Sequence, residues 1–139
     1  MNASEAEMKL AKEMLKDAEL MLKKNRLRSL VNRAYYGMFH ATRAILLYLN
    51  IDCTSHAGVI NRFGECVIKK GLAKEELAKS LHRGYRLREK SDYQPVSKIS
   101  NEEAKALYDE AKGFVREIER LLRQLKREEE NKDGGGEEL

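Results

Sequence analysis

Arginine, tyrosine and histidine side chains recur along one predicted helix at a spacing that could bind phosphate. Arg33, Tyr36, His40 and Arg43 are three and four positions apart, and their neighbours are mostly apolar. On a helix this spacing places them in one stripe, which could hold a phosphate or line a groove between two subunits. The alternative is structural, because a lone histidine among apolar residues is more often a hydrogen-bonded core residue. Buried arginines also need acids, another subunit or a ligand as partners, since an unpaired buried charge is costly.

A second group of reactive side chains lies near the end of a basic helix, just before the only proline. Arg88 and Asp92 are four positions apart and form a predicted helical ion pair, which could simply stabilise the end of the helix. Alternatively, Arg88 and Tyr93 project into a shared groove, where arginine binds phosphate bidentately and tyrosine stacks on a base. Arg86 adds to the positive charge here, and His82 falls near the same helical stripe as Tyr93.

The elements that must position these residues are helices, because the composition favours helix throughout. The chain has one proline and few aromatic residues, and it is rich in leucine, alanine, glutamate, lysine and arginine. We predict an all-α fold, an antiparallel up-and-down helical bundle of four main helices plus a shorter helix. Asn25 separates the first two helices. Apolar residues recur at helical spacing in five segments, at about residues 4–24, 27–49, 56–70, 74–90 and 100–129.

Polar and glycine residues mark the predicted ends of these helices. Ser4 and Ser100 each precede a glutamate by three residues, which is the pattern of a capping box. Ser55 or Thr54 can cap the third helix, and Gly71 follows its end as a C-terminal glycine. These signals predict where each helix begins and ends.

The formal net charge of +4 hides a marked separation of charge along the chain. Residues 128–139 contain six acids and one lysine, so residues 1–127 carry a net charge of +9. We predict a single helical domain over residues 1–130 and a disordered acidic tail over residues 131–139. The basic domain could attract nucleic acid, although lysines and arginines dispersed over solvated helices would give the same charge.

Three segments of the chain resemble the HEPN family of helical nucleotide- and RNA-associated proteins, in particular its small stand-alone members. The resemblance covers about residues 11–125, and its specific parts are residues 33–41, 55–60 and 87–93. It implies a homodimer, often encoded beside a minimal nucleotidyltransferase in a prokaryotic toxin–antitoxin system. We therefore expect a nucleotide- or RNA-binding module that is a partner of such a nucleotidyltransferase. The predicted nucleotide- or RNA-binding residues are Arg33, Tyr36, His40, Arg86 and Tyr93.

Active members of that family are metal-independent RNases that resemble one another in an arginine followed by a histidine. The arginine stabilises charge on the phosphorane, and the histidine moves the proton of the RNA 2′-hydroxyl. Arg86 and Arg88 match the arginine, but Ser91, Asp92 or Tyr93 occupies the histidine position. The alternative function is therefore a metal-independent endoribonuclease toxin with a degenerate version of this motif.

The candidate catalytic residues of such an enzyme are Arg88 and Asp92. Because the charged form of Asp92 is favoured beside Arg88, its carboxylate would be a weak base. His56 or His82 could supply the imidazole if folding or dimerisation brings it to the cleft. Tyr93 matches the place where some toxins of the family carry a tyrosine modified by the nucleotidyltransferase.

The sequence indicates neither a cofactor nor a metal site. Cys53 and Cys66 lack partners at short spacing, which is typical of reduced thiols inside cells, and with His40 and His56 they do not form a ligand pattern. No apolar run approaches the roughly 20 residues of a membrane span. The amino terminus is a charged amphipathic segment rather than a signal peptide. We therefore expect a cytoplasmic protein that does not associate with membranes.

Overall fold

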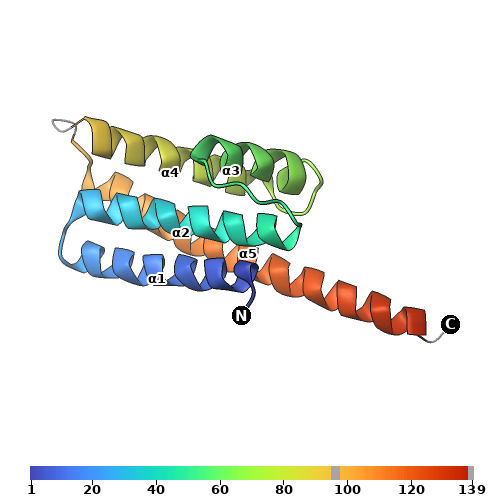
Figure 1. The fold of residues 1–139 in the computed structure, drawn as a ribbon. Coiled ribbons are helices and arrows are strands. Elements are labelled where there is room, and N and C mark those ends of the chain that lie inside the picture. The colour runs from blue at the N-terminus through green and yellow to red at the C-terminus, as the bar shows by residue number, and fades with distance from the viewer. Residues whose placement is uncertain (95–97, 138–139) are drawn as a thin grey trace.

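The computed structural model describes residues 1–94 and 98–137, and in these residues it contains helices and loops only (Figure 1). Four long helices run alternately in opposite directions, with a shorter helix beside them, so the predicted all-α bundle is confirmed. Within the described ranges, no helix is both long enough and apolar enough to span a membrane. The elements are α1 (Ala3–Lys23), α2 (Leu27–Tyr48), α3 (His56–Phe63), η1 (Gly64–Ile68), α4 (Glu75–Tyr93) and α5 (Asn101–Glu137).

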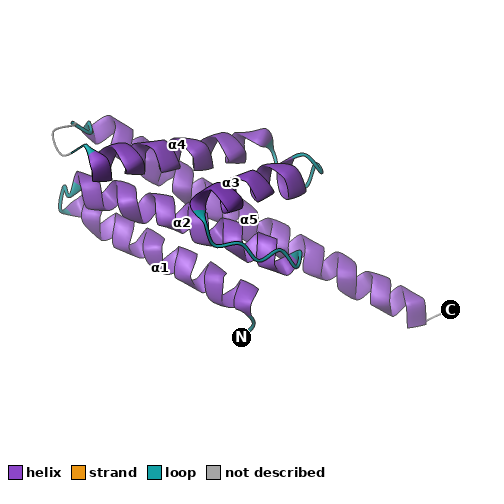
Figure 2. Ribbon diagram, turned by 45° about the horizontal axis from the view of Figure 1, so that its top comes forward, coloured by secondary structure: helices purple, strands orange, loops and turns teal. Residues whose placement is uncertain are grey.

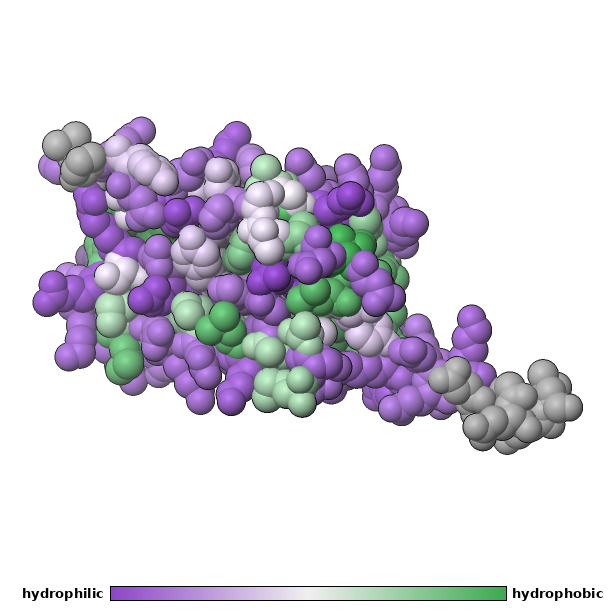
Figure 3. All heavy atoms as spheres, viewed as in Figure 1, coloured by the Kyte–Doolittle hydropathy of each residue, from purple (hydrophilic) through white to green (hydrophobic). Residues whose placement is uncertain are grey.

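The centre of the bundle is α2, which packs against α1, α3, α4 and α5. Its apolar residues recur at helical spacing on more than one face, so the helix is buried on several sides, as its composition predicts. The face seen in Figure 3 is mostly hydrophilic, with apolar side chains gathering near the end of α2 and along α1. The largest fully buried side chains of α2 are Leu30, Val31, Tyr35, Met38, Ile45 and Leu46.

The loop after α2 turns back along that helix, so that α3 begins beside the middle of α2 (Figures 1 and 2). Asn50 starts the reversal with a positive φ of 64°, a conformation that asparagine tolerates better than most residues. The Ser55 side chain then caps α3 by accepting a hydrogen bond from the backbone N–H of Gly58. The predicted cap is therefore confirmed, and it fixes the position of His56, the first residue of α3.

The predicted helix over residues 56–70 is present from His56 to Ile68, but its second part, η1, is a wider π-helical turn. The backbone N–H of Lys69 donates to the carbonyl of Gly64, five residues earlier, at 2.9 Å. Val59, Phe63 and Val67 are all buried and four positions apart, and a wider turn keeps such a spacing on one face better than a regular α-helix. Gly71 then ends the segment with φ of 76°, as predicted.

The first helix begins differently from the prediction, because Asn2 rather than Ser4 caps it. The Asn2 side chain accepts a hydrogen bond from the backbone N–H of Glu5. Ser4 is buried, and its hydroxyl donates to the carbonyl of Ala44 in α2 at 2.7 Å. The capping box predicted at Ser4 was wrong, because the serine side chain faces a neighbouring helix. At the other end of α1, Asn25 has a positive φ and ends the helix as predicted.

Two helix ends near the carboxyl terminus lie further along the chain than predicted. α4 continues to Tyr93 rather than Lys90, supported by the ion pair between Arg88 and Asp92 in its last turns. The Ser100 cap of α5 is confirmed, since its hydroxyl accepts from the backbone N–H of Glu103. α5 runs past the predicted end at Glu129 to Glu137, and it projects beyond the other helices in Figure 1. A domain boundary at residue 130 and an acidic tail over residues 131–139 stay predictions, and residues 138–139 lie outside the described part.

Gly37 allows α1 and α2 to approach closely. A Cβ atom at this position would lie 3.0 Å from Leu15 Cδ2 and 3.5 Å from the carbonyl oxygen of Ala11. We expect Gly37→Val to lower the free energy of unfolding by about 1–3 kcal/mol through overpacking, as measured by urea denaturation. Gly113→Val is the matched control, because nothing lies within 4 Å of a Cβ atom there. Equal stability of the two variants would contradict this account of Gly37.

Candidate functional site

Arg88 and His56 meet between α3 and α4, although 32 positions separate them in the chain. The Nη1 atom of Arg88 lies 3.5 Å from Nε2 of His56. Arg88 comes from the second half of α4, and His56 is held at the capped start of α3. We call this place the Arg88–His56 site, and its members are Arg88, His56, Tyr35, Tyr36 and Asp92.

The contacts on both sides of the His56 ring favour one tautomer of the neutral imidazole. The Tyr35 hydroxyl lies 2.7 Å from Nδ1 of His56, on the side of the ring opposite Arg88. A guanidinium group only donates hydrogen bonds, so its contact with Nε2 requires that nitrogen to carry a lone pair. Nδ1 then carries the proton and donates it to the Tyr35 oxygen. His56 is therefore neutral in this arrangement, with its basic nitrogen facing the arginine.

Aromatic side chains surround both members of the pair. The Arg88 guanidinium carbon lies 5.4 Å from the ring centroid of Tyr36, within the range of a cation–π contact. The His56 ring centroid lies 4.9 Å from that of Phe39 and 5.7 Å from that of Tyr85. These rings exclude part of the water from the site, which strengthens electrostatic interactions with a bound anion.

Asp92 partly neutralises the positive charge of Arg88. Its Oδ2 atom accepts a hydrogen bond from Nε of Arg88 at 3.0 Å, so the predicted pair four positions apart on the helix is confirmed. The Arg88 side chain is 13% exposed, whereas that of Asp92 is 36% exposed. Nε is taken by Asp92 and one terminal nitrogen lies near His56, which leaves the guanidinium further N–H donors for a ligand.

Burial favours the neutral forms of both His56 and Tyr35, because it lowers the pKa of the imidazole and raises the pKa of the phenol. The partly buried position of His56 lowers its pKa below the usual 6.5, the Arg88 charge lowers it further, and Glu89 opposes the shift. Burial, followed by the neighbouring Tyr36, raises the pKa of Tyr35, so its hydroxyl stays protonated. A neutral imidazole beside an arginine is therefore the stable state of the site at neutral pH.

This shift predicts that the protein loses stability as the pH falls below about 6.5. The pKa of His56 is lower in the folded than in the unfolded chain, so the unfolded chain binds the proton more readily and acid favours unfolding. We expect His56→Gln to remove this part of the pH dependence, measured by urea denaturation between neutral and mildly acidic pH. His82→Gln, at an exposed histidine, is the control. An unchanged pH slope in His56→Gln would contradict the assignment.

His40 and Arg43, from the predicted stripe on α2, pair with an acid of α1, and the ring centroid of His40 lies 6.0 Å from that of Tyr36. Nδ1 of His40 lies 2.6 Å from one carboxylate oxygen of Glu7, and Arg43 Nη1 lies 2.5 Å from the other. Arg43 also donates from Nε to the carbonyl of Cys53, in the loop that leads to α3. The side chains of Glu7, His40 and Arg43 are only 15–18% exposed. The structure thus divides the stripe, since Tyr36 points to Arg88 while these two residues pair with an acid.

The other predicted binding residues lie apart from the Arg88–His56 site. Arg33 is exposed and lies 3.7 Å from Asp17 of α1. Arg86 and His82 lie on the opposite side of α4, where they line a groove against α5. Tyr93 is the last residue of α4 and is 73% exposed. A role for these residues and for His40 in binding nucleotide or RNA stays a prediction.

The described residues contain no cluster of three or more histidine, cysteine or acidic side chains that could hold a metal ion. Cys53 and Cys66 are both free thiols. The Arg88–His56 site combines a cation, an imidazole, tyrosine hydroxyls and the carboxylate of Asp92. This set can bind a phosphodiester and can accept a proton from a neighbouring hydroxyl.

Comparison with known proteins agrees with these features. The family model described as the HEPN domain matches residues 4–128. A protein of Thermotoga maritima named "UPF0332 protein" is 38% identical over 117 residues, which are 84% of this chain and 89% of that protein. A protein of Methanocaldococcus jannaschii named "Putative toxin" is 35% identical over 121 residues, which are 87% of this chain and 90% of that protein. A "UPF0332 protein" of Archaeoglobus fulgidus is 30% identical over 122 residues, 88% of this chain and 97% of the relative.

Proposed function

This chain belongs to the HEPN family, and from that premise we propose that it is a toxin-type protein that binds RNA at the Arg88–His56 site. The name of the Methanocaldococcus relative supports the toxin-type role. The observation that carries the proposal is the contact between the Arg88 guanidinium and a neutral His56 within a ring of aromatic side chains. Arginine binds phosphate oxygens, and the neighbouring tyrosine rings offer surfaces on which a base can stack.

The proposal includes a homodimer and a nucleotidyltransferase partner in the cytoplasm. Two copies of the basic second half of α4 would together form a longer binding surface for an anionic polymer than one copy does. Tyr93 supports the partner, because its exposed hydroxyl at the end of α4 is accessible to a modifying enzyme. Sedimentation analysis tests the dimer, and incubation with a minimal nucleotidyltransferase and nucleotide, followed by mass spectrometry of Tyr93, tests the partnership.

A metal-independent endoribonuclease is the second candidate, and the position of His56 is the observation that favours it. His56 supplies in space the imidazole that the α4 motif lacks in sequence. In such a reaction, Nε2 of His56 would take the proton of the RNA 2′-hydroxyl, and the 2′-oxygen would form a bond to phosphorus. The bond from phosphorus to the 5′-oxygen would break, with its proton supplied by water, and Arg88 would stabilise the charge on the phosphorus oxygens. The product would be a 2′,3′-cyclic phosphate.

One experiment separates the two candidates. A fluorescent single-stranded RNA is mixed with the full chain in the presence of a chelator, and both anisotropy and strand length are measured. Binding without cleavage supports the binding protein, whereas cleavage that leaves a cyclic phosphate and is lost in His56→Ala supports the enzyme. Absence of both binding and cleavage, for RNA oligonucleotides of varied sequence, would contradict the proposed function.

A further inference from the structure

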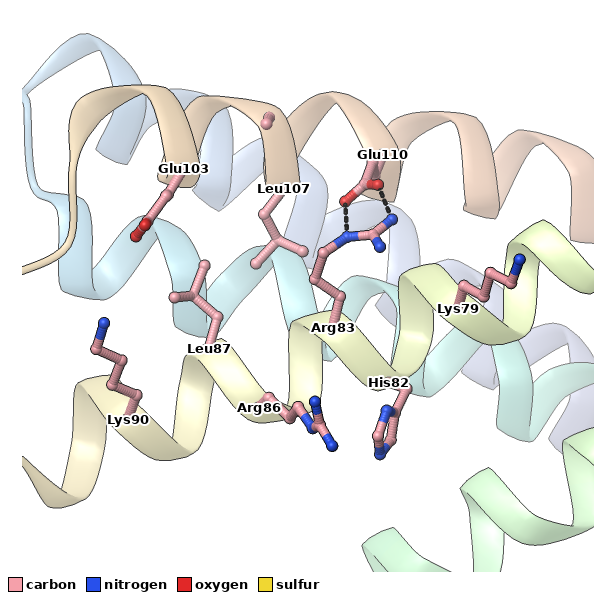
Figure 4. Close-up of a pocket in the computed structure, with 10 residues that line it drawn as sticks. Lys79, His82, Arg83, Arg86, Leu87, Lys90, Glu103, Leu107 and Glu110 are labelled. Carbon is pink, nitrogen blue, oxygen red and sulfur yellow. Dashed lines mark hydrogen bonds and ion pairs between the residues drawn. The ribbon is translucent and has the colours of Figure 1, made fainter.

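A second concave surface lies between α4 and α5 (Figure 4). At about 3.6 residues per turn, Arg86 and Arg88 point about 160° apart around α4. The groove has a volume of about 610 Å³. Leu87 of α4 with Ala106 and Leu107 of α5 gives it an apolar floor. This groove is therefore separate from the Arg88–His56 site.

The α4 side of the groove carries positive charge at a helical spacing. Lys79, His82, Arg86 and Lys90 follow one another at steps of three and four residues and all line the groove. Figure 4 shows His82 and Arg86 next to each other on the edge of α4 that faces away from α5. From Lys79 to Lys90 this row extends about 16 Å along the axis of α4, which is about three helical turns.

The α5 side of the groove carries two carboxylates. Glu110 pairs with Arg83 of α4, whose Nε donates to Glu110 Oε2 at 3.1 Å, and whose terminal nitrogen bonds the other oxygen. This bidentate pair links the two helices, as the dashed lines in Figure 4 show. Glu103 lines the same side nearer the start of α5. Positive charge therefore predominates along the α4 edge, and negative charge along α5.

We propose that this groove docks an acidic amphipathic helix of another protein. Apolar side chains of that helix would pack on Leu87, Ala106 and Leu107, and its glutamates or aspartates would face the basic row of α4. Charge complementarity and the apolar floor both support this occupant. Nucleic acid fits less well, because a sugar–phosphate backbone gains little from an apolar floor.

The test uses the full chain and a labelled synthetic helix about four turns long, with leucines on one face and glutamates beside them. The reference peptide has lysine at every glutamate position. We expect the acidic peptide to bind, as measured by fluorescence anisotropy, and to bind more weakly at high salt, while the lysine peptide does not bind. Equal binding of the two peptides, or no binding of the acidic one, would overturn the proposal.

Groove variants locate the peptide. The double variant Lys79→Glu and Arg86→Glu should bind the acidic peptide about tenfold more weakly, because two exposed attractive pairs become repulsive. Ala106→Gln fills part of the floor at an exposed helical position without a change of charge, and it should weaken binding as well. Arg116→Glu, an exposed charge reversal elsewhere on α5, and Arg88→Gln should leave peptide binding unchanged.

Two results would contradict the assignment of the groove. If the Lys79→Glu and Arg86→Glu variant binds the acidic peptide as well as the unmodified chain does, the peptide binds elsewhere. If a single-stranded RNA binds more tightly than the peptide and displaces it, and if the same double variant abolishes this RNA binding, the groove is a nucleic-acid surface. Circular dichroism confirms that each variant is folded, and both charge reversals are at exposed positions.

Discussion

Replacing Arg88 with glutamine is expected to lower the affinity for single-stranded RNA by at least about tenfold. A hydrogen bond between a charged donor and a phosphate contributes about 1.5–3 kcal/mol, which corresponds to a factor of ten or more in the dissociation constant. Glutamine also removes the cation that lies 5.4 Å from the Tyr36 ring. The measurement is a titration of labelled RNA by anisotropy, with chelator present so that a metal does not contribute.

Two further substitutions show whether the arginine acts through its shape or only through its charge. Arg88→Lys keeps the charge but loses the planar fork of donors, so it should restore only part of the affinity. Arg86→Gln removes an equal charge from the opposite side of α4 and should have a much smaller effect. If Arg86→Gln and Arg88→Gln weaken RNA binding equally, general charge rather than the Arg88–His56 site holds the RNA.

If the protein cleaves RNA, Arg88→Gln should also slow the single-turnover rate by a factor of about 100 or more, because a donor to the transition state is lost. His56→Ala should abolish cleavage and leave most of the RNA affinity. Loss of both activities to the same extent in the two variants would indicate a common structural defect, which urea denaturation would reveal as a lowered free energy of unfolding.

The largest expected effect on stability comes from Glu7, the acid that pairs with both His40 and Arg43. We expect Glu7→Gln to lower the free energy of unfolding by about 2–3 kcal/mol, since it leaves a mostly buried arginine without its carboxylate partner. Arg43 keeps a contact with Asp52 at 3.6 Å, but that carboxylate is 76% exposed and compensates little. Urea denaturation at neutral pH measures the change.

Glu13→Gln is the matched control for this prediction. Glu13 belongs to the same helix, and its exposed side chain should contribute less than about 0.5 kcal/mol. Equal losses of stability in Glu7→Gln and Glu13→Gln would mean that the network around Glu7 is not a major source of stability. A loss confined to Glu7→Gln, and absent when Arg43 is replaced by methionine in the same chain, would assign the effect to the unpaired arginine.

The helices could be predicted because their signals are local in the sequence. Apolar residues three and four positions apart give α1, α2, α4 and α5, and Asn25, Ser55, Gly71 and Ser100 mark helix ends where the structure has them. The prediction was wrong at Ser4, whose hydroxyl bonds a neighbouring helix rather than its own. Residues 64–68 are helical as predicted, but they form a π-helical turn, which the apolar spacing alone does not distinguish from an α-helix.

The candidate site was predictable only in part, because its contacts join distant segments. The ion pair of Arg88 with Asp92 is local and could be predicted from a spacing of four. The contact of Arg88 with His56 depends on the path of the loop that brings α3 back along α2. Tyr35 was not predicted as a member of the site, because its place among apolar residues of the helix is typical of a core residue. In the structure it is fully buried, and its hydroxyl also bonds His56.

The bond from Arg43 to the carbonyl of Cys53 joins α2 to the loop before His56, and the ion pair of Arg43 with Glu7 joins α2 to the first helix. Glu7 holds Arg43, Arg43 holds the loop, and three residues later the loop delivers the imidazole to Arg88. This chain of contacts links the first two turns of α1 to a histidine that they do not touch. A substitution of Glu7 is therefore expected to shift His56 relative to Arg88, on the other side of α2, although every residue of the Arg88–His56 site is unchanged.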